Sequence, residues 1–414
     1  MRFATIADLR LVARLASRNV TRHKARAGMT VGAITFGVAA MILSGGFVRD
    51  IYAQLAEATI HSQSGHIQIA KAGYFGSGSR SPEKYVIASL DGARELASAQ
   101  PETADVMARL SLTGLLSNGR ADTPIVGEGV EPAKEAALGT YLRIVEGRAL
   151  EDGDRDGALI GYGVARALNL KPGDTATVVA STGGGAMNTA EVRVIGIFQS
   201  LSRDYDARAV RVPLAVAQEL LDSKGANVLV VSLHRTSSTD SVAARLRRKA
   251  AEAGLEVKTW QELNDFYPKT VELYERQFGI LQLIIFAMVL LSVMNTVNMS
   301  VFERLGEFGT MRALGNRGLG VFGLVVAENA LLGAAGALLG AFVGIFLASI
   351  ISIFGISMPP PPNADVGYVA RIRVVPSVVA AACAIGFLAT VLASIFPAMR
   401  VARGSVVDAL RQNV

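Results

Sequence analysis

The sequence predicts an α-helical membrane protein with four transmembrane helices and a large α+β extracytoplasmic domain between helices 1 and 2. Hydrophobic residues make up 51% of the 414 residues and charged residues only 18%, against about 25% charged in ordinary soluble domains. Four apolar windows reach the length of about 20 residues that crosses a bilayer. The long segment between the first two windows has the composition of a soluble domain.

Hydropathy and charge divide the chain into successive segments, and composition excludes two classes of protein. A chain this apolar is not disordered, and its single cysteine, Cys383, provides no disulfide scaffold. The third window is longer than one perpendicular crossing at 1.5 Å per residue, so it must tilt, break or project. The segments are a cytoplasmic basic segment (1–26), transmembrane helix 1 (27–48), the extracytoplasmic domain with a stalk helix at each end (49–276), transmembrane helix 2 (277–301), a cytoplasmic helix (302–318), transmembrane helix 3 (319–354), a Pro-rich outer loop (355–373), transmembrane helix 4 (374–399) and a cytoplasmic tail (400–414).

Basic residues in the short segments set the expected orientation. With four spans, the N-terminal segment, the loop after span two and the tail share one side, and the positive-inside rule makes that side cytoplasmic. Both termini are therefore expected in the cytoplasm. No small-residue cleavage site follows the first span, so we expect a retained anchor. The basic residues are Arg2, Arg10, Arg14, Arg18, Arg22, Lys24 and Arg26, then Arg304, Arg312 and Arg317, then Arg400, Arg403 and Arg411.

The N-terminal arginines from Arg10 to Arg26 recur at every fourth residue, with apolar residues between them. This spacing predicts an amphipathic helix on an anionic membrane surface. Control of topology alone explains the same charges equally well. Because the charge stands where a membrane protein needs it, nucleic acid is not an expected partner.

The segment between spans one and two carries mixed signals of strand and helix. Val- and Ile-rich stretches bounded by turn residues predict strands at 66–69, 175–180, 191–198 and 227–233. Helical spacing predicts helices at 161–168, 213–221 and 241–253. Residues 51–60 and 260–282 continue the helical spacing of spans one and two, which favours two stalk helices over simple linkers.

Catalytic and metal motifs are not found in the sequence. It contains no P-loop, so it is not expected to bind ATP in that way. The four histidines, His23, His61, His66 and His234, are far apart in sequence, which argues against a zinc site. We expect a non-catalytic protein with no cofactor and no metal in this chain.

Small and polar residues inside the spans indicate helix packing. Gly336, Gly340 and Gly344 have the small-x-x-x-small spacing of closely packed helices, within one subunit or, less readily, between subunits. Glu328 is either a proton or ion site or bonds to neighbouring helices near the inner interface. It stands alone and no inverted repeat is seen, which disfavours a secondary transporter. Further polar residues are Asn295, Thr296, Asn298 and Asn329.

The loop between spans two and three predicts a short amphipathic helix on the cytoplasmic side. Its charges alternate at helical spacing, and its apolar residues form a stripe. The helix either rests on the membrane or docks a cytosolic motor. The charges are Glu303, Arg304, Glu307 and Arg312, and the stripe is Leu305, Phe308, Met311 and Leu314.

Residues 298–315, NMSVFERLGEFGTMRALG, resemble the signature of FtsX-like ABC transporter permeases, the MacB/LolE-type or mechanotransmitter class. The tail, PAMRVA at 397–402 and VDALR at 407–411, resembles the ending of that family, although Val406 and Val407 stand where Pro is common. The outer segment resembles the MacB-like periplasmic core domain at 146–148, 161–174, 196–198, 212–213 and 260–263. SGHIQI at 64–69 and MPPPP at 358–362 are similar to the LolC/LolE lipoprotein-releasing branch.

The resemblance implies a multi-pass inner-membrane permease that works with other chains. Two permease subunits, identical or related, would associate with two copies of a separate ABC ATPase, which would bind ATP and Mg. The ATPase-coupling residues implied are Glu303, Arg304, Glu307, Phe308, Met311, Arg312 and Leu314.

The lipoprotein-releasing branch further implies a lipoprotein or lipid substrate, with a periplasmic carrier as a further partner, and an acyl-chain cavity at the outer ends of spans one and two. Ordinary dimer packing explains any single cavity residue equally well. Two other functions are alternatives to lipoprotein extraction: an efflux permease with a periplasmic adaptor and outer-membrane tunnel, and a regulator of cell-wall hydrolases. The large outer domain disfavours the regulator. The matching cavity positions are Phe47, Val48, Ile51, Tyr52 and Leu55, facing Tyr274, Phe278, Leu281 and Leu283.

Overall fold

The computed structural model describes residues 24–78, 81–139, 142–200, 202–264, 266–359 and 367–404. The expected amphipathic helix before residue 24, residues 360–366 of the Pro-rich loop and most of the tail lie outside these ranges. The chain forms two compact units. Unit 1 contains residues 1–52, 271–357 and 369–414, and unit 2 contains residues 53–270 and 358–368.

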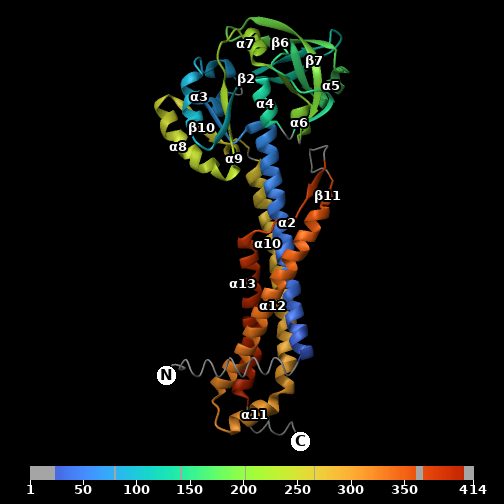
Figure 1. Ribbon diagram of the computed structural model, residues 1–414, viewed down its shortest axis with the longest axis vertical. Helices are drawn as coiled ribbons and strands as arrows, with labels where there is room; N and C mark the ends of the chain where they lie inside the picture. Colours follow the sequence, from blue (N-terminus) through green and yellow to red (C-terminus); the bar gives the residue numbers. More distant parts are fainter. Residues whose placement is uncertain are drawn as a thin grey trace. The chain divides into compact units, whose positions relative to one another are not determined.

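Four long helices make up unit 1, and all four are long and apolar enough to cross a membrane (Figure 1). The third is one unbroken helix, so the excess length of its window is not taken up by a break. The stalk helix predicted at 260–282 is interrupted at Asn264, where α9 (Trp260–Leu263) ends. The four are α2 (Lys24–Thr59), α10 (Phe266–Glu303), α12 (Gly318–Phe354) and α13 (Pro376–Arg403).

Glycines allow α12 to approach α2 closely. A Cβ atom added to Gly340 would lie 2.7 Å from the Cβ of Val38 and 3.0 Å from the backbone oxygen of Thr35. Thr35 Oγ1 also donates a hydrogen bond of 3.3 Å to the carbonyl oxygen of Gly336. Lipid tails are as apolar as the helices, so the hydrophobic effect does not drive helices together in a membrane. Small residues allow the backbones to approach closely, and the resulting van der Waals contacts stabilise the pair. The predicted glycine face therefore packs against α2 of the same chain.

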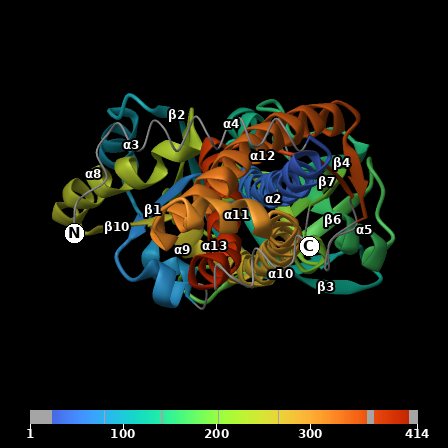
Figure 2. The same ribbon diagram turned by 90° about the horizontal axis from the view of Figure 1, so that it is seen from below.

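The short helix α11 (Leu305–Ala313) lies across one end of the unit 1 bundle, where α10 ends and α12 begins (Figures 1 and 2). It is shorter than the predicted segment 302–318, because α10 continues to Glu303 and α12 already begins at Gly318. At the other end of the bundle, strands β11 (Ile356–Met358) and β12 (Tyr368–Ala370) pair in the connection between α12 and α13.

Unit 2 is built on one ten-stranded mixed sheet. Its strand order is β10-β1-β9-β2-β3-β8-β5-β7-β4, and β6 pairs with β2 and β7. Two pairs are parallel, β3 with β8 and β5 with β7. The strands are β1 (Ile67–Lys71), β2 (Thr103–Ser117), β3 (Asp122–Val130), β4 (Arg143–Gly147), β5 (Gly157–Gly161), β6 (Thr175–Ser181), β7 (Met187–Gln199), β8 (Ala209–Pro213), β9 (Val228–Leu233) and β10 (Leu255–Thr259).

Helices cover two separate apolar cores of this sheet (Figure 1). One core packs α3 and α8 against β1, β2 and β9, and the other packs α5 and α7 against β5 to β8. The predicted strands are confirmed as β1, β6, β7 and β9, and the predicted helices as α5, α7 and α8. The helices are α3 (Asp91–Ser98), α4 (Pro132–Leu138), α5 (Tyr162–Leu168), α6 (Arg203–Asp206), α7 (Leu214–Leu220) and α8 (Thr239–Glu252).

Candidate functional site

The predicted coupling residues divide into a buried and an exposed group around α11. Phe308 and Arg304 are buried, at 1% and 7% exposure. Leu305 and Met311 are half-buried and pack against the helix core. Leu314, predicted to continue the apolar stripe, is 84% exposed because α11 ends one residue before it. Of the charged members, Glu303 and Glu307 are exposed and Arg312 is half-buried, with its guanidinium donating to the carbonyl oxygen of Gly404.

Arg304 joins α11 to α12 through a buried ion pair. Its Nη1 atom lies 2.7 Å from Glu328 Oε2, and its Nη2 atom lies 3.2 Å from Glu328 Oε1. The Nε atom donates to Glu307 Oε2 at 3.0 Å, and the guanidinium lies 5.0 Å from the centre of the Phe308 ring. A two-point arginine–carboxylate contact fixes orientation as well as distance. Glu328 is thus bonded to a neighbouring element, which is one of the two roles predicted for it.

Three helices of unit 1 form two adjoining recesses at the end of the bundle opposite α11. The recesses have volumes of about 190 and 290 Å³ and share Arg49, Gln282 and Val378 as lining residues. The smaller one is also lined by Val48, Tyr52 and Phe278, for which the resemblance to the lipoprotein-releasing branch implied an acyl-chain cavity. The remaining lining residues are Gly45, Glu275 and Gly279 in the smaller recess and Met41, Ser377, Ala381, Ala382 and Ile385 in the larger.

Aromatic residues hold α2 against α10 beside the smaller recess. The ring centres of Tyr52 and Tyr274 are 6.5 Å apart, and those of Tyr274 and Phe278 are 6.3 Å apart. The Tyr52 hydroxyl donates to the carbonyl oxygen of Val271 at 3.2 Å. A tyrosine buried with its hydroxyl satisfied gives both apolar contact and a fixed orientation. These contacts bring together Tyr52, Tyr274 and Phe278 as the sequence expected.

The other predicted cavity residues line neither of these two recesses. Phe47 and Ile51 are half-buried elsewhere on α2, and Leu281 and Leu283 are 39% and 65% exposed on α10. Leu55 is half-buried and belongs to unit 2. The sequence did not predict that residues of α13 line the recesses. The contact of the fourth span with the first two depends on tertiary packing, and no local sequence pattern specifies it.

A buried carboxylate fixes the segment before α13 to α2 next to the recesses. Asp50, 4% exposed, accepts a hydrogen bond of 2.8 Å from the backbone N–H of Arg371 and one of 3.1 Å from Arg373 Nε. The backbone N–H of Arg373 donates to the carbonyl oxygen of Gly46 at 3.2 Å. A Cβ atom at Gly46 would lie 2.6 Å from the Arg373 oxygen, so this approach requires glycine.

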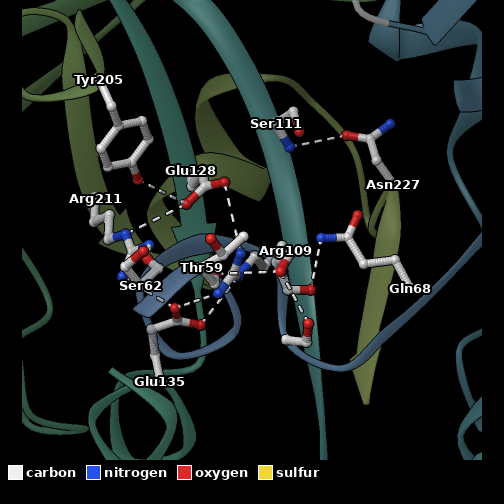
Figure 3. A network of polar contacts seen from close by, with 12 residues as sticks. Thr59, Ser62, Gln68, Arg109, Ser111, Glu128, Glu135, Tyr205, Arg211 and Asn227 are labelled. Carbon is white, nitrogen blue, oxygen red and sulfur yellow. Dashed lines mark hydrogen bonds and ion pairs between the residues drawn. The ribbon is translucent and has the colours of Figure 1, made fainter. Parts of the chain in front are cut away.

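Unit 2 contains a separate polar network beside the π-helical turn η1 (Ile60–Ser64) that follows α2 (Figure 3). Arg211, on the buried strand β8, is 1% exposed and donates from Nη2 to the carbonyl oxygen of Ser62 at 3.0 Å. Its Nη1 atom lies 3.0 Å from Glu135 Oε1 and its Nε atom 3.3 Å from Glu128 Oε2. Arg109 Nε donates to Glu135 Oε2 at 3.1 Å. Arg211 thus stabilises the turn that follows α2 directly, and Glu135, Glu128 and Arg109 are joined to it in one network of buried or half-buried charges.

The charges of this network stabilise one another. Burial opposes ionisation of Glu135, but Arg109 and Arg211 outweigh it, so the pKa of the Glu135 carboxyl lies below its usual value. Burial also raises the pKa of Tyr205 to about 12. The Tyr205 hydroxyl donates to Glu128 Oε2 at 3.4 Å. Glu135 is therefore ionised and Tyr205 is neutral near pH 7.

His66 lies in a second polar cluster of unit 2 and is held neutral. Its Nδ1 atom accepts the backbone N–H of Leu233 at 3.1 Å, and its Nε2 atom lies 3.2 Å from the Thr236 hydroxyl, which donates to Glu57 at 2.7 Å. Burial lowers the pKa of His66 to about 4. Among the residues that the structure describes, no group of His, Cys, Asp or Glu side chains is placed to hold a metal ion.

Two sequence families match the chain and decide its class. The MacB-like periplasmic core domain matches residues 27–249, and the FtsX-like permease C-terminal domain matches residues 279–406. The chain belongs to the FtsX-like family of ABC transporter permeases. The match to the core domain covers unit 2 except residues 250–270 and 358–368. The permease therefore carries a MacB-like periplasmic core domain between its first and second membrane helices, as the sequence predicted.

Curated relatives are 23% to 26% identical to this permease over the residues that align. An uncharacterized ABC transporter permease of Methanocaldococcus jannaschii is 26% identical over 50% of this chain and 52% of its own length, so the match spans about half of that relative. The lipoprotein-releasing system transmembrane protein LolC of Neisseria meningitidis is 23% identical over 77% of this chain and 76% of its own. LolE of Haemophilus influenzae is 24% identical over 61% of this chain and 62% of its own.

Solved structures similar to part of the permease include a periplasmic region and an extracellular domain of two transporters. The periplasmic region of MacB from Actinobacillus actinomycetemcomitans is 17% identical and covers 51% of this chain and 94% of its own, with a TM-score of 0.37. The extracellular domain of the transporter YknZ from Gram-positive bacteria is 15% identical and covers 47% of this chain and 99% of its own, with a TM-score of 0.35.

Proposed function

We propose that this permease extracts lipoproteins, or another lipidated or amphipathic substrate, from the outer leaflet of the inner membrane. A separate ATPase hydrolyses ATP in the cytoplasm, and a second permease subunit, identical or related, completes the complex. The observation that carries the proposal is the pair of recesses between α2, α10 and α13, because Val48, Tyr52 and Phe278 line the smaller one at positions expected for an acyl-chain cavity. The similarity to LolC over about three quarters of both chains supports the same substrate class.

The contacts within unit 1 offer a route from α11 to the recess. An ATPase that moves α11 acts on α12 through the buried pair of Arg304 and Glu328. The glycine face of α12 is in direct contact with α2 at Val38, so a displacement of α12 is passed to α2. Close-packed interiors transmit displacement because they have little free volume to absorb it. Since α2 also forms one wall of both recesses, its movement changes the shape of the proposed acyl-chain site.

Mass spectrometry of the complex, purified gently in detergent from its native membrane, tests the substrate class. An ATPase that co-purifies with a lipidated protein supports extraction of lipoproteins. An ATPase that co-purifies with an adaptor or tunnel protein, and no lipidated protein, contradicts it and favours efflux.

Leu314 tests the coupling surface. Because its side chain is 84% exposed at the end of α11, Leu314→Ser is expected to leave the fold intact and to weaken association with the ATPase about tenfold, as loss of one apolar anchor of an interface does. Leu273→Ser is the matched control, since Leu273 is 64% exposed near the opposite end of α10. Equal retention of the ATPase by both variants would contradict docking at α11.

A further inference from the structure

Two charged side chains of the smaller recess have no partner within the described part of the chain. Arg49 is exposed on α2 and lines both recesses, and Glu275 is exposed on α10 and lines the smaller one. Neither side chain makes an ion pair or a hydrogen bond with another described residue. Their neighbours in sequence differ in this respect, because Asp50 is bonded to Arg373 and Arg276 is paired with Glu272.

The recess lies at the level where three membrane helices change from apolar to polar. The apolar window of α2 ends at Val48, directly before Arg49. That of α10 begins near Phe278, one turn after Glu275, and α13 begins at Pro376, next to the lining residue Ser377. Phosphate and amine groups of lipids occupy this level of a bilayer, with acyl chains toward its centre.

We propose that the smaller recess binds the headgroup of a zwitterionic phospholipid with a primary amine. The phosphate pairs with the guanidinium of Arg49 and accepts from the amide of Gln282, and the ammonium pairs with the carboxylate of Glu275. Arginine suits phosphate because its fork of N–H donors matches two phosphate oxygens. An acyl chain extends along the larger recess, where it contacts the apolar lining residues of α2 and α13, which are Met41, Val378, Ala381, Ala382 and Ile385.

The carboxylate decides which headgroup fits. With Arg49 alone, any phospholipid would bind through its phosphate, and a lipid with net negative charge would bind best. Glu275 attracts a cation and opposes the net negative charge of phosphatidylglycerol, whose neutral hydroxyls gain only a hydrogen bond from the carboxylate. A primary ammonium has three N–H donors for the carboxylate, whereas a trimethylated ammonium has none. The recess therefore favours phosphatidylethanolamine over phosphatidylglycerol and phosphatidylcholine.

This site does not depend on the proposed extraction of lipoproteins, because lipid binding needs neither the ATPase nor a protein substrate. Its test uses the full-length chain with any co-purifying partners, delipidated in detergent. Phosphatidylethanolamine, phosphatidylglycerol and phosphatidylcholine with identical acyl chains are added in equal amounts, and bound lipid is counted by native mass spectrometry. The unmodified permease is expected to retain mainly phosphatidylethanolamine.

Two substitutions separate the two charges. Arg49→Gln is expected to lower retention of all three lipids about tenfold, because it removes a charge-assisted contact with the phosphate. Glu275→Gln is expected to abolish the preference for phosphatidylethanolamine while phosphatidylglycerol binding rises. Arg49→Lys keeps a cation and is expected to restore part of the binding, which distinguishes loss of a contact from misfolding.

Arg276→Gln is the matched control. Arg276 adjoins Glu275 in sequence, its side chain is 77% exposed, it pairs with Glu272 and it does not line the recess, so its loss is expected to leave lipid retention unchanged. Equal retention of the three lipids by the unmodified protein would overturn the proposal. So would an effect of Arg276→Gln as large as that of Arg49→Gln, because the arginines would then attract lipid only through general surface charge.

Discussion

The two units of this permease bury charged side chains in different ways. In unit 1, the buried charges lie at the two ends of the helices: Asp50 is bonded to Arg373 at one end, and Arg304 to Glu328 toward the other. In unit 2, Arg109 and Arg211 lie inside the sheet, with two glutamates between them. The middle of the membrane helices contains apolar residues and the glycine face instead.

The difference follows from what each environment supplies to a charge. A bilayer core offers no water and no free backbone groups, so a charge within it is costly unless it is paired near an interface. The interior of unit 2 offers additional partners, such as the carbonyl oxygen of Ser62 and the hydroxyl of Tyr205. Buried charges in unit 1 therefore join one helix to the next, whereas those in unit 2 fix the turn that ends α2.

The largest expected effect is that of removing Arg211. Arg211→Met leaves Glu135 and Glu128 with only Arg109 as a buried cation, and we expect a loss of about 3–5 kcal/mol of unfolding free energy. Trp260, the only tryptophan, is 3% exposed in unit 2, so its fluorescence during denaturant unfolding reports on this unit.

An exposed ion pair of the same unit is the control for that loss. Arg193 lies 3.7 Å from Asp156 with both side chains about 60% exposed, and Arg193→Met is expected to have almost no effect because exposed pairs contribute little. If the Arg211 variant unfolded at the same denaturant concentration as the Arg193 variant, the network would not stabilise unit 2.

A smaller effect is expected when the pH is lowered through the range in which histidine titrates. Burial holds the pKa of His66 at about 4, below the unfolded value of about 6.5. Between these values the unfolded chain binds a proton that the folded chain does not, so stability is lost as pH falls. We expect a loss of about 1.5 kcal/mol between pH 6.5 and pH 5, measured by Trp260 fluorescence.

His66→Asn separates this effect from other titrations, including that of His61, whose ring lies 5.9 Å from that of His66. The amide oxygen of asparagine can replace Nδ1 as acceptor of the Leu233 N–H, but asparagine does not titrate. Unfolding free energy of this variant is expected to change little over the same pH range. An undiminished slope would show that His66 is not its source.

The smallest expected effect concerns the ion pair of unit 1. A double-mutant cycle of Arg304→Met and Glu328→Gln is expected to give a coupling free energy of about 1 kcal/mol in a steric-trapping or thermal assay in detergent. It is expected to be modest because Arg304 keeps Glu307 as a second partner at 3.0 Å.

Arg276→Met and Glu272→Gln form the control cycle for this measurement. Their side chains are 77% and 62% exposed on α10, and a coupling free energy within experimental error is expected. If the two cycles gave equal coupling, α11 would not be fixed to α12 through Arg304, and the proposed route from the ATPase to α2 would lose its first step.

Much of the architecture was predictable because it depends on local composition. The four spans, the inserted α+β domain and the short helix after span two follow from hydropathy and charge, and the motif at 298–315 indicated the family. Strands rich in Val and Ile, such as β6 and β9, were predicted for the same reason. By contrast, apolar and polar residues alternate too irregularly along β2, a strand of 15 residues, for the sequence to predict it. The strand β8 was not predicted because it contains Arg211, a residue type that is usually exposed.

The sequence by itself determined that this chain is a membrane protein with glycine-mediated helix contacts, because long apolar windows and small-residue spacing carry that information within a single segment; the motif at 298–315 added its resemblance to permeases. Only the tertiary structure decided which distant residues meet. Arg304 pairs with Glu328, α13 closes the recess beside Val48, and Arg49 and Glu275 line one recess without a partner among the residues that the structure describes. The physical reason is that such pairings are set by the crossing of separate helices, and hydropathy along one helix does not specify which neighbour its polar residues face.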